Sequence, residues 1–277
     1  MVYYHLPGLF EHFEVYFRLI PIFRAEREKF YDNTEIGSVF GSPTMCIWNG
    51  GRWSYADAIE WEALDFVREW NLPVGLTFSN CLLEQCHLGD TRCNNILRMF
   101  ENDTASVMIN SPLLEAYIRE NYPKYKINAS TTRCKGSEAA EELLNYNLTV
   151  LDHQYNNDTQ FLKNIRHPER VELLCNAVCL PDCQRRKEHY EYISAGIIGT
   201  ERAGKFDCER VFYPFSLVQQ FSPTYISKER MDELVTLGFK NFKFEGRNTH
   251  VVDLIEILVY YMAKPQYQME IRQRLIN

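Results

Sequence analysis

The sequence lacks a long apolar run, an excess of basic side chains and the usual start of a secreted protein. No apolar stretch approaches the roughly 18 residues that span a bilayer, so we expect no membrane segment. The 30 basic side chains are outnumbered by 37 acidic ones, so nucleic acid is not an expected partner, although a local basic patch is compatible with the net charge of −7. Residues 1–7 have neither the basic region nor the apolar core of a secretion signal, which predicts a cytoplasmic protein.

Common catalytic and nucleotide-binding motifs are missing too. The sequence contains no GxSxG nucleophile elbow, no P-loop and no HExxH zinc motif. Hydrophobic residues make up 45% and charged residues 24% of the chain, which excludes a disordered tail, a collagen-like fibre and a bare coiled coil. No proline- or serine-rich linker divides the chain, so one globular domain is expected.

What is present is a repeated alternation of short apolar runs and helical patterns. The runs are rich in β-branched and aromatic residues, as the buried strands of a parallel sheet are. The eight predicted strands comprise residues 45–48, 74–78, 107–109, 125–128, 148–151, 171–174, 217–221 and 242–244.

Helix signals lie between these runs. Ser111 before Pro112 is typical of an N-cap followed by proline in the first turn, while Ser227 begins another helix and Gly238 ends it. Eight strands that alternate with helices predict a single (β/α)8 barrel of the TIM type over residues 41–277, closed by pairing of the first and eighth strands. A doubly wound open sheet is the alternative.

Two segments depart from the regular alternation. Residues 1–40 are predicted to form an N-terminal helical extension that packs on the barrel, with a helix between Phe13 and Phe30. The connection at about residues 190–215 is predicted to be an insertion over one barrel mouth. The N-terminal segment is also a candidate docking surface for a protein partner, through the aromatic residues Phe10, Phe13, Tyr16 and Phe17.

Polar residues at the ends of the predicted strands form the candidate site, because barrel enzymes build their sites at the C-terminal strand ends. Strand alternation directs Lys243 and Glu245 into the lumen. Charges there are costly unless paired, so they fit a structural network, a pocket for a polar ligand, or both in different layers. The predicted catalytic residues are Glu245, Lys243 and Asp152, and the predicted substrate-binding residues are Arg247, Asn110, Asn176 and Ser130.

A cysteine group follows the sixth predicted strand. Cys175, Cys179 and Cys183 have the spacing C-x3-C-x3-C, and Cys208 in the inserted segment is a natural fourth ligand. Thiolates this close in sequence can converge on an iron–sulfur cluster or on zinc. The alternative is a set of incidental loop thiols with no metal.

The last third of the chain resembles a known family. Residues 231–234, the Leu237-Gly238-Phe239 turn and the Lys243-Phe244-Glu245-Gly246-Arg247 segment are similar to the closing segment of the collagenase-like peptidase family. Glu172, with Cys179 and Cys183 beyond it, also matches in position. The resemblance covers about residues 170–262 and implies a barrel of the same type.

The resemblance also implies a cofactor and a reaction. Several members of that family hold a [4Fe–4S] cluster on four cysteines and support oxygen-independent hydroxylation of ubiquinone precursors or RNA bases. Carried over, the cluster ligands are Cys175, Cys179, Cys183 and Cys208. The leading prediction is therefore an iron–sulfur-dependent barrel enzyme in a redox or hydroxylation-type modification of an undetermined substrate. The alternatives are a peptidase or other hydrolase, and a non-enzymatic binding subunit of a larger complex.

Overall fold

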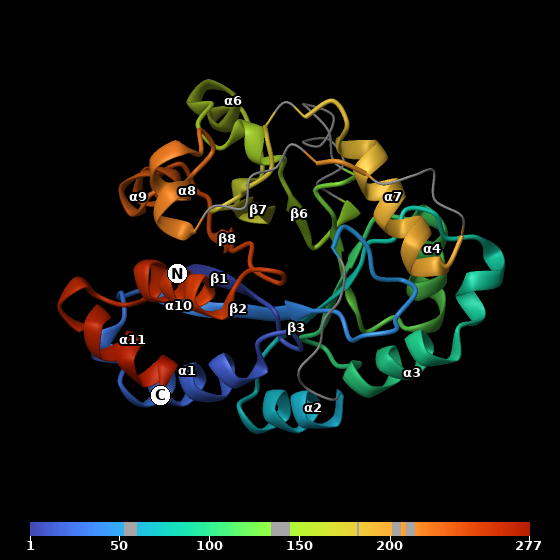
Figure 1. Cartoon of the computed structure of the whole chain (residues 1–277), viewed down its shortest axis with the longest axis horizontal. Coiled ribbons are helices and arrows are strands. Elements are labelled where there is room, and N and C mark those ends of the chain that lie inside the picture. Colours follow the sequence, from blue (N-terminus) through green and yellow to red (C-terminus); the bar gives the residue numbers. More distant parts are fainter. Residues whose placement is uncertain (53–59, 134–144, 182, 201–205, 209–213) are drawn as a thin grey trace.

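Eight parallel strands close into a barrel in the computed structural model, and helices cover the outside of the barrel (Figure 1). The structure describes residues 1–52, 60–133, 145–181, 183–200, 206–208 and 214–277. Each strand pairs with the next along the chain, and β8 pairs with β1, so the predicted (β/α)8 barrel is confirmed. The strands are β1 Val2–Pro7, β2 Thr34–Gly41, β3 Val74–Phe78, β4 Ser106–Ile109, β5 Lys126–Ala129, β6 Leu148–Val150, β7 Val171–Leu174 and β8 Asn241–Lys243.

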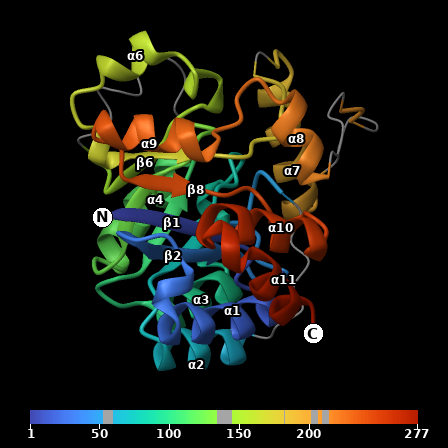
Figure 2. The ribbon, with the colours of Figure 1, turned by 90° about the vertical axis from the view of Figure 1, so that its left-hand side faces the viewer.

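The helices connect the strands and pack on their outer faces (Figure 2). The α-helices are α1 Phe13–Ala25, α2 Glu60–Glu69, α3 Thr91–Phe100, α4 Pro112–Asn121, α6 Thr159–Lys163, α7 Arg186–Ile198, α8 Phe215–Phe221, α9 Lys228–Thr236, α10 Val251–Met262 and α11 Gln268–Ile276. Short 3₁₀ helices are η1 Arg27–Lys29, η2 Gln85–Gly89, η5 His153–Tyr155, η6 Pro168–Arg170 and η7 Pro265–Tyr267. None of the helices in the described ranges is long and apolar enough to cross a bilayer.

Local sequence signals explain several helix ends. The Ser111 hydroxyl accepts a hydrogen bond from the Leu114 amide and so caps α4, and Ser227 caps α9 in the same way. Gly238 follows α9 with φ of +99°, a conformation that glycine adopts without steric cost. The predicted starts of these two helices and the glycine stop are therefore confirmed.

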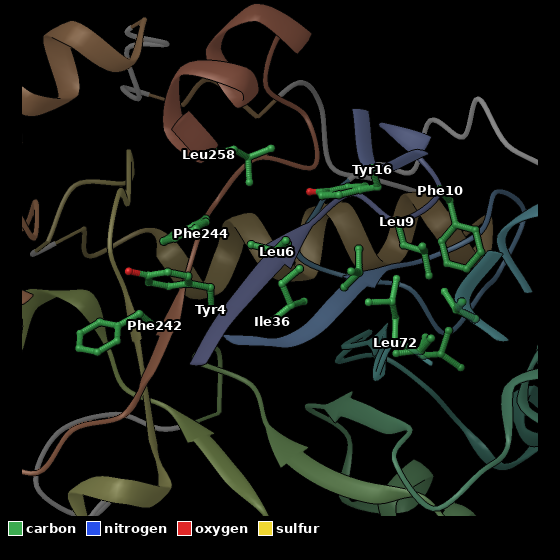
Figure 3. Close-up of a cluster of buried hydrophobic side chains, with 14 of the residues drawn as sticks. Tyr4, Leu6, Leu9, Phe10, Tyr16, Ile36, Leu72, Phe242, Phe244 and Leu258 are labelled. Atoms are coloured by element: carbon green, nitrogen blue, oxygen red, sulfur yellow. The ribbon is translucent and has the colours of Figure 1, made fainter. Parts of the chain in front are cut away.

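The hydrophobic core lies between the outer faces of the strands and the helices. Tyr4 of β1, Phe244 after β8 and Tyr261 of α10 are fully buried, and the ring of Phe244 stacks on that of Tyr261 at 4.7 Å. Figure 3 shows Tyr4 and Phe244 side by side where the first and last strands meet. Aromatic packing thus stabilises the seam that closes the barrel.

The predicted N-terminal extension is wrong, because residues 1–40 contain β1, α1 and β2. In Figure 2, β1 lies between β2 and β8 in the wall of the barrel. Their lumen-facing residues are polar or small: His5 contacts Ser38, and Gly37 leaves room for the His5 ring. The barrel therefore extends to the N-terminal residues and is not confined to residues 41–277.

The predicted first strand, residues 45–48, is a turn, and closure uses β1 in its place. Two of its side chains, Cys46 and Trp48, are buried without joining the sheet, whereas Met45 is 83% exposed. Trp48 packs edge-on against Phe78 and donates a hydrogen bond to the His87 carbonyl. Met45 has a positive φ of 58°, which is incompatible with a strand. A short apolar run reports burial and does not by itself distinguish a strand from a packed loop.

The predicted seventh strand is also wrong, because residues 217–221 belong to helix α8. Phe215 and Val218 are buried at a helical spacing of three, whereas Phe221 is 65% exposed. The proposed insertion at about 190–215 begins within α7, and residues 201–205 and 209–213 lie outside the described residues.

Only some aromatic residues of the predicted N-terminal docking surface are exposed to solvent. Phe10 and Tyr16 are fully buried and cannot serve as docking residues. Phe17 is 56% exposed, and it packs with Phe13 against Phe66 of α2.

The opposite burial of two phenylalanines gives a direct test of this fold. We expect Phe242→Ala to lower the free energy of unfolding by about 3–5 kcal/mol, since Phe242 of β8 is fully buried. The same substitution at the exposed Phe221 should change it by less than about 0.5 kcal/mol. Urea unfolding followed by circular dichroism measures both, and equal losses would contradict the helical, exposed position of Phe221.

Candidate functional site

A cavity of about 120 Å³ opens at the C-terminal end of the barrel. Barrel enzymes place their chemistry at this end, and the residues that line the cavity come from several strand ends and the loops that follow them. The polar and charged residues of the lining include Arg52, Thr77, Ser79, Ser130, Thr131, Thr132, His153, Cys179, Tyr190, Lys243, Glu245 and Arg247.

A buried ion pair forms the floor of this cavity. Lys243 of β8 donates to Glu172 of β7 at 3.0 Å, and the Glu172 residue is only 1% exposed. The Lys243 ammonium also lies 3.8 Å from the centre of the Phe40 ring. Burial lowers the pKa of Lys243, while Glu172 opposes that shift. Lys243 is thus held in an ion pair in the lumen while it lines the cavity, and its predicted catalytic role stays a prediction.

His5 completes the floor from the first strand. Its Nδ1 lies 2.8 Å from the Ser38 hydroxyl and 3.4 Å from a Glu172 oxygen, and its Nε2 lies 3.2 Å from Asn241 Oδ1. Burial lowers the pKa of His5, which favours the neutral ring. The floor therefore joins β1, β7 and β8 through one carboxylate.

A second ion pair lies above the floor, between Glu245 and Arg52. The Arg52 guanidinium donates to Glu245 Oε1, and the Val178 amide donates to Oε2 at 3.3 Å. Asn176 fixes the Glu245 backbone, because its side chain accepts from the Glu245 amide at 2.7 Å and donates to the Glu245 carbonyl at 2.8 Å. Asn176 thus positions Glu245, and its predicted contact with substrate stays a prediction.

Arg247 crosses the cavity toward β3. Its Nη1 donates to Thr77 at 2.8 Å and to Asn49 at 3.1 Å, and its side chain is only 9% exposed. Burial lowers its pKa, and the Glu11 carboxylate 3.9 Å away opposes that shift. Arg247 was predicted to bind substrate, and the structure places it in the cavity lining.

The other predicted polar residues separate into two places. Ser130 lines the mouth cavity. Asn110 and Asp152 line a neighbouring cavity of about 440 Å³, where Asp152 pairs with Arg186 and caps η5. Asp152 was predicted to be catalytic together with Glu245, but it does not line the mouth cavity. Its role and that of Asn110 stay predictions for the neighbouring cavity.

The cysteines do not gather as predicted. Cys175 is fully buried in the core, and its thiol points toward the Leu173 carbonyl at 3.7 Å. Cys179, Cys183 and Cys208 line a third cavity of about 460 Å³ without Cys175. Burial raises the pKa of the Cys179 thiol, so it is not an activated nucleophile. In the part of the chain that the structure describes, no three His, Cys, Asp or Glu side chains are arranged to hold a metal ion.

The four-cysteine ligand set therefore does not fit this structure. Cys175 directly follows β7 and packs on the helix-facing side of the barrel wall, which removes its thiol from the third cavity. The remaining thiols are of the right chemical type for iron or zinc. Cys134 lies outside the described residues.

Several residues of the mouth were missed or undervalued in the sequence. Arg52 follows a Gly-Gly pair, and Gly50 is required because a side chain there would stand 2.4 Å from the Ser79 backbone. Tyr190 lies on α7, and no strand-end signal indicates it. Glu11 was missed because residues 1–40 were assigned to an extension.

Comparisons with known proteins support the architecture and little beyond it. No family model matches the chain, and no curated protein sequence matches it. The solved structure of the U32 peptidase Mk0906 is similar, with a TM-score of 0.54 and 14% sequence identity over 90% of this chain and 95% of that one. At this identity the likeness concerns the fold, and over most of the chain that fold is shared with a U32 peptidase.

The floor pair yields a stability prediction. Lys243→Met should lower the free energy of unfolding by about 3–5 kcal/mol, because it leaves Glu172 buried and uncompensated. The double substitution Lys243→Met with Glu172→Leu should recover most of that loss. The exposed pair of Lys264 and Asp32 is the control, and Lys264→Met should cost less than about 1 kcal/mol in the same urea titration. A small loss for Lys243→Met alone would contradict a structural floor.

Proposed function

We propose that this chain is a hydrolase of the collagenase-like, U32 peptidase type that cleaves a peptide-like, carboxylate-bearing substrate at the barrel mouth. The observation that supports this proposal is the charge of the cavity lining. Among the described residues, Arg52 and Arg247 contribute positive charge to the lining, and Glu245 is the carboxylate that faces the same space. Lys243 also lines it, but its charge is balanced by Glu172. The fold of the U32 peptidase Mk0906 supports the reaction class.

The cationic side chains would bind the substrate carboxylate. A guanidinium group matches a carboxylate with two parallel N–H donors, and such pairs are strong in a site shielded from water. Arg247 is already oriented by Thr77 and Asn49, so its ordering does not oppose binding. The carboxylate would thereby be fixed relative to Glu245.

Glu245 would act as the general base. Its carboxylate would accept a proton from a water molecule as the water oxygen bonds to the substrate carbonyl carbon. When the C–N bond breaks, that proton would pass to the leaving amine, so no oxidant or reductant is needed. Asn176 would keep the carboxylate in place by holding its backbone.

Tyr190 would stabilise the developing negative charge. Burial raises its pKa to about 12, so the phenol stays protonated at neutral pH and can donate a hydrogen bond. Tyr190 lines both the mouth cavity and the neighbouring cavity with Asp152. A substrate longer than the mouth would extend past Tyr190 toward Asn110 and Asp152.

The activity prediction concerns Glu245. Glu245→Gln should lower kcat at least about 100-fold in an assay of peptide cleavage by mass spectrometry, because it removes the general base. Its melting temperature should stay close to that of the wild type. Glu256→Gln, in the surface pair of Glu256 and Arg272, is the matched control and should keep full activity. A large loss of stability in Glu245→Gln would instead mark the Arg52 pair as structural.

A second candidate function is the iron–sulfur-dependent, hydroxylation-type modification. The observation that favours it is that Cys179, Cys183 and Cys208 line one cavity and that Cys179 also lines the mouth. A cluster held there would supply electron transfer next to the substrate cavity. The candidate ligands are Cys179, Cys183 and Cys208, without Cys175. Their side chains are not arranged for a metal ion in the described structure, so they would have to converge on the cluster when it binds.

Metal analysis tests this candidate. After anaerobic isolation we expect about four iron and four sulfide ions per chain. Cys183→Ser and Cys208→Ser should lose the iron, whereas Cys175→Ser should keep it, since Cys175 lies in the core. Cys86→Ser, at an exposed thiol outside this cavity, is the control. Loss of iron in Cys175→Ser alone would contradict the ligand set, and one zinc per chain would indicate a structural site.

A further inference from the structure

We infer that Glu11 is a positioning residue that acts through Arg247, and that an anionic ligand binds at the mouth with uptake of a proton by Glu11. As a carboxylate, Glu11 balances the charge of Arg247. As a carboxylic acid, Glu11 is neutral, and the positive charge of Arg247 is then balanced by the bound ligand. The ligand part of this inference rests on the proposed function, whereas the titration of Glu11 does not.

The position of Glu11 is unusual for a carboxylate. It lies between β1 and α1, directly behind the mouth, and the residue is 4% exposed. Neither of its carboxylate oxygens accepts a hydrogen bond from any residue that the structure describes. A side chain at Gly41 would stand 2.8 Å from Glu11 Oε2, so this glycine of β2 keeps open the space that the carboxylate occupies.

Few charged or titratable groups face Glu11 in the described structure. Arg247, from the loop after β8, is 3.9 Å from Oε1. Tyr16, from α1, is buried beside it, but its hydroxyl donates to the Pro7 carbonyl and not to Glu11. The backbone amides of Phe10, Glu11 and Ser42 lie close without hydrogen-bond geometry. Arg247 is therefore the cation that determines the charge state of Glu11.

These surroundings place the titration near neutrality. Burial raises the pKa of Glu11 to about 7, and Arg247 and the nearby amides oppose the shift without cancelling it. An anion bound at Arg247 adds negative charge next to Glu11, which raises that pKa further. Binding and proton uptake are therefore linked.

Protonation of Glu11 makes the positive charge of Arg247 available to a ligand without moving the guanidinium group. Its hydrogen bonds to Thr77 and Asn49 hold it in the cavity in either state of Glu11. The proton on Glu11 thus alters the net charge that the ligand meets, and the geometry stays the same. This separates Glu11 from the Glu172 carboxylate, which Lys243 neutralises directly.

Stability as a function of pH tests the titration in the free protein. The pKa is higher in the folded than in the unfolded chain, so the folded form binds the extra proton between about pH 4.5 and pH 7. The wild type should therefore lose stability relative to Glu11→Gln as the pH rises through this window. Its unfolding equilibrium constant should increase, relative to that of the variant, by up to about tenfold per pH unit. Above about pH 7.5 the difference should be constant.

The control and a second measurement keep this test decisive. Glu256→Gln, in the half-buried ion pair with Arg272, should keep the wild-type slope. If Glu11→Gln does not fold, infrared spectroscopy of the wild type between pH 5 and pH 8 follows the protonated carboxyl group directly. A stability difference between wild type and Glu11→Gln that is independent of pH, or no carboxyl titration near pH 7, overturns the inference.

Calorimetry with N-acetylglycine as the probe tests the link to binding. Titrations at pH 7 in two buffers of different ionisation enthalpy should show proton uptake in the wild type and none in Glu11→Gln. At pH 8, Glu11→Gln should bind the probe up to about tenfold more tightly than the wild type, since Arg247 then has no competing carboxylate. Binding without proton uptake overturns the link. If the probe does not bind at any pH although Glu11 titrates as expected, the proposed function is contradicted. The linkage between binding and proton uptake is contradicted with it, whereas the titration of Glu11 is confirmed.

Discussion

The buried ion pair of Lys243 and Glu172 constrains the rest of this barrel. Glu172 is enclosed in the lumen, and a carboxylate there is tolerated only because Lys243 donates to one oxygen and His5 lies beside the other. The three residues come from β8, β7 and β1, which are neighbours only when the barrel is closed. A slip of one residue in any of these strands would turn its charge outward into the apolar helix layer.

The register that this pair imposes determines the mouth. With Lys243 in the lumen, Phe244 faces α10, and Glu245 and Arg247 emerge at the C-terminal rim. Asn176 then ties the end of β8 to the segment after β7. The loop after β2 brings Arg52 to Glu245 and depends on Gly50, which passes close to the Ser79 backbone. The buried Lys243–Glu172 pair thus lies beneath a charged layer of Glu245, Arg52 and Arg247 that lines the mouth cavity.

The prediction of strands from sequence worked for β3 to β8, including β7 and β8, whose lumen faces carry Glu172 and Lys243. The strands β3 and β4 are buried throughout, and their short runs bounded by turn residues were recognised. It failed for β1 and β2, because residues 1–40 were assigned as one helical extension and the runs that flank α1 were not assigned as strands. Reliance on short apolar runs also made a strand of the turn around Trp48, which is buried as a loop.

The fold class, six of the eight strands, two capped helices and the polar character of the strand ends can all be predicted from the residues. They can be predicted because periodicity reports which face of an element is buried. Which charges meet follows from how the strands and loops come together in space. Glu245 pairs with Arg52 across 193 residues, Glu11 lies behind Arg247, and Cys175 packs in the core away from Cys179. These contacts depend on barrel closure and on loops from different strands, and periodicity within one element carries no information about partners from another.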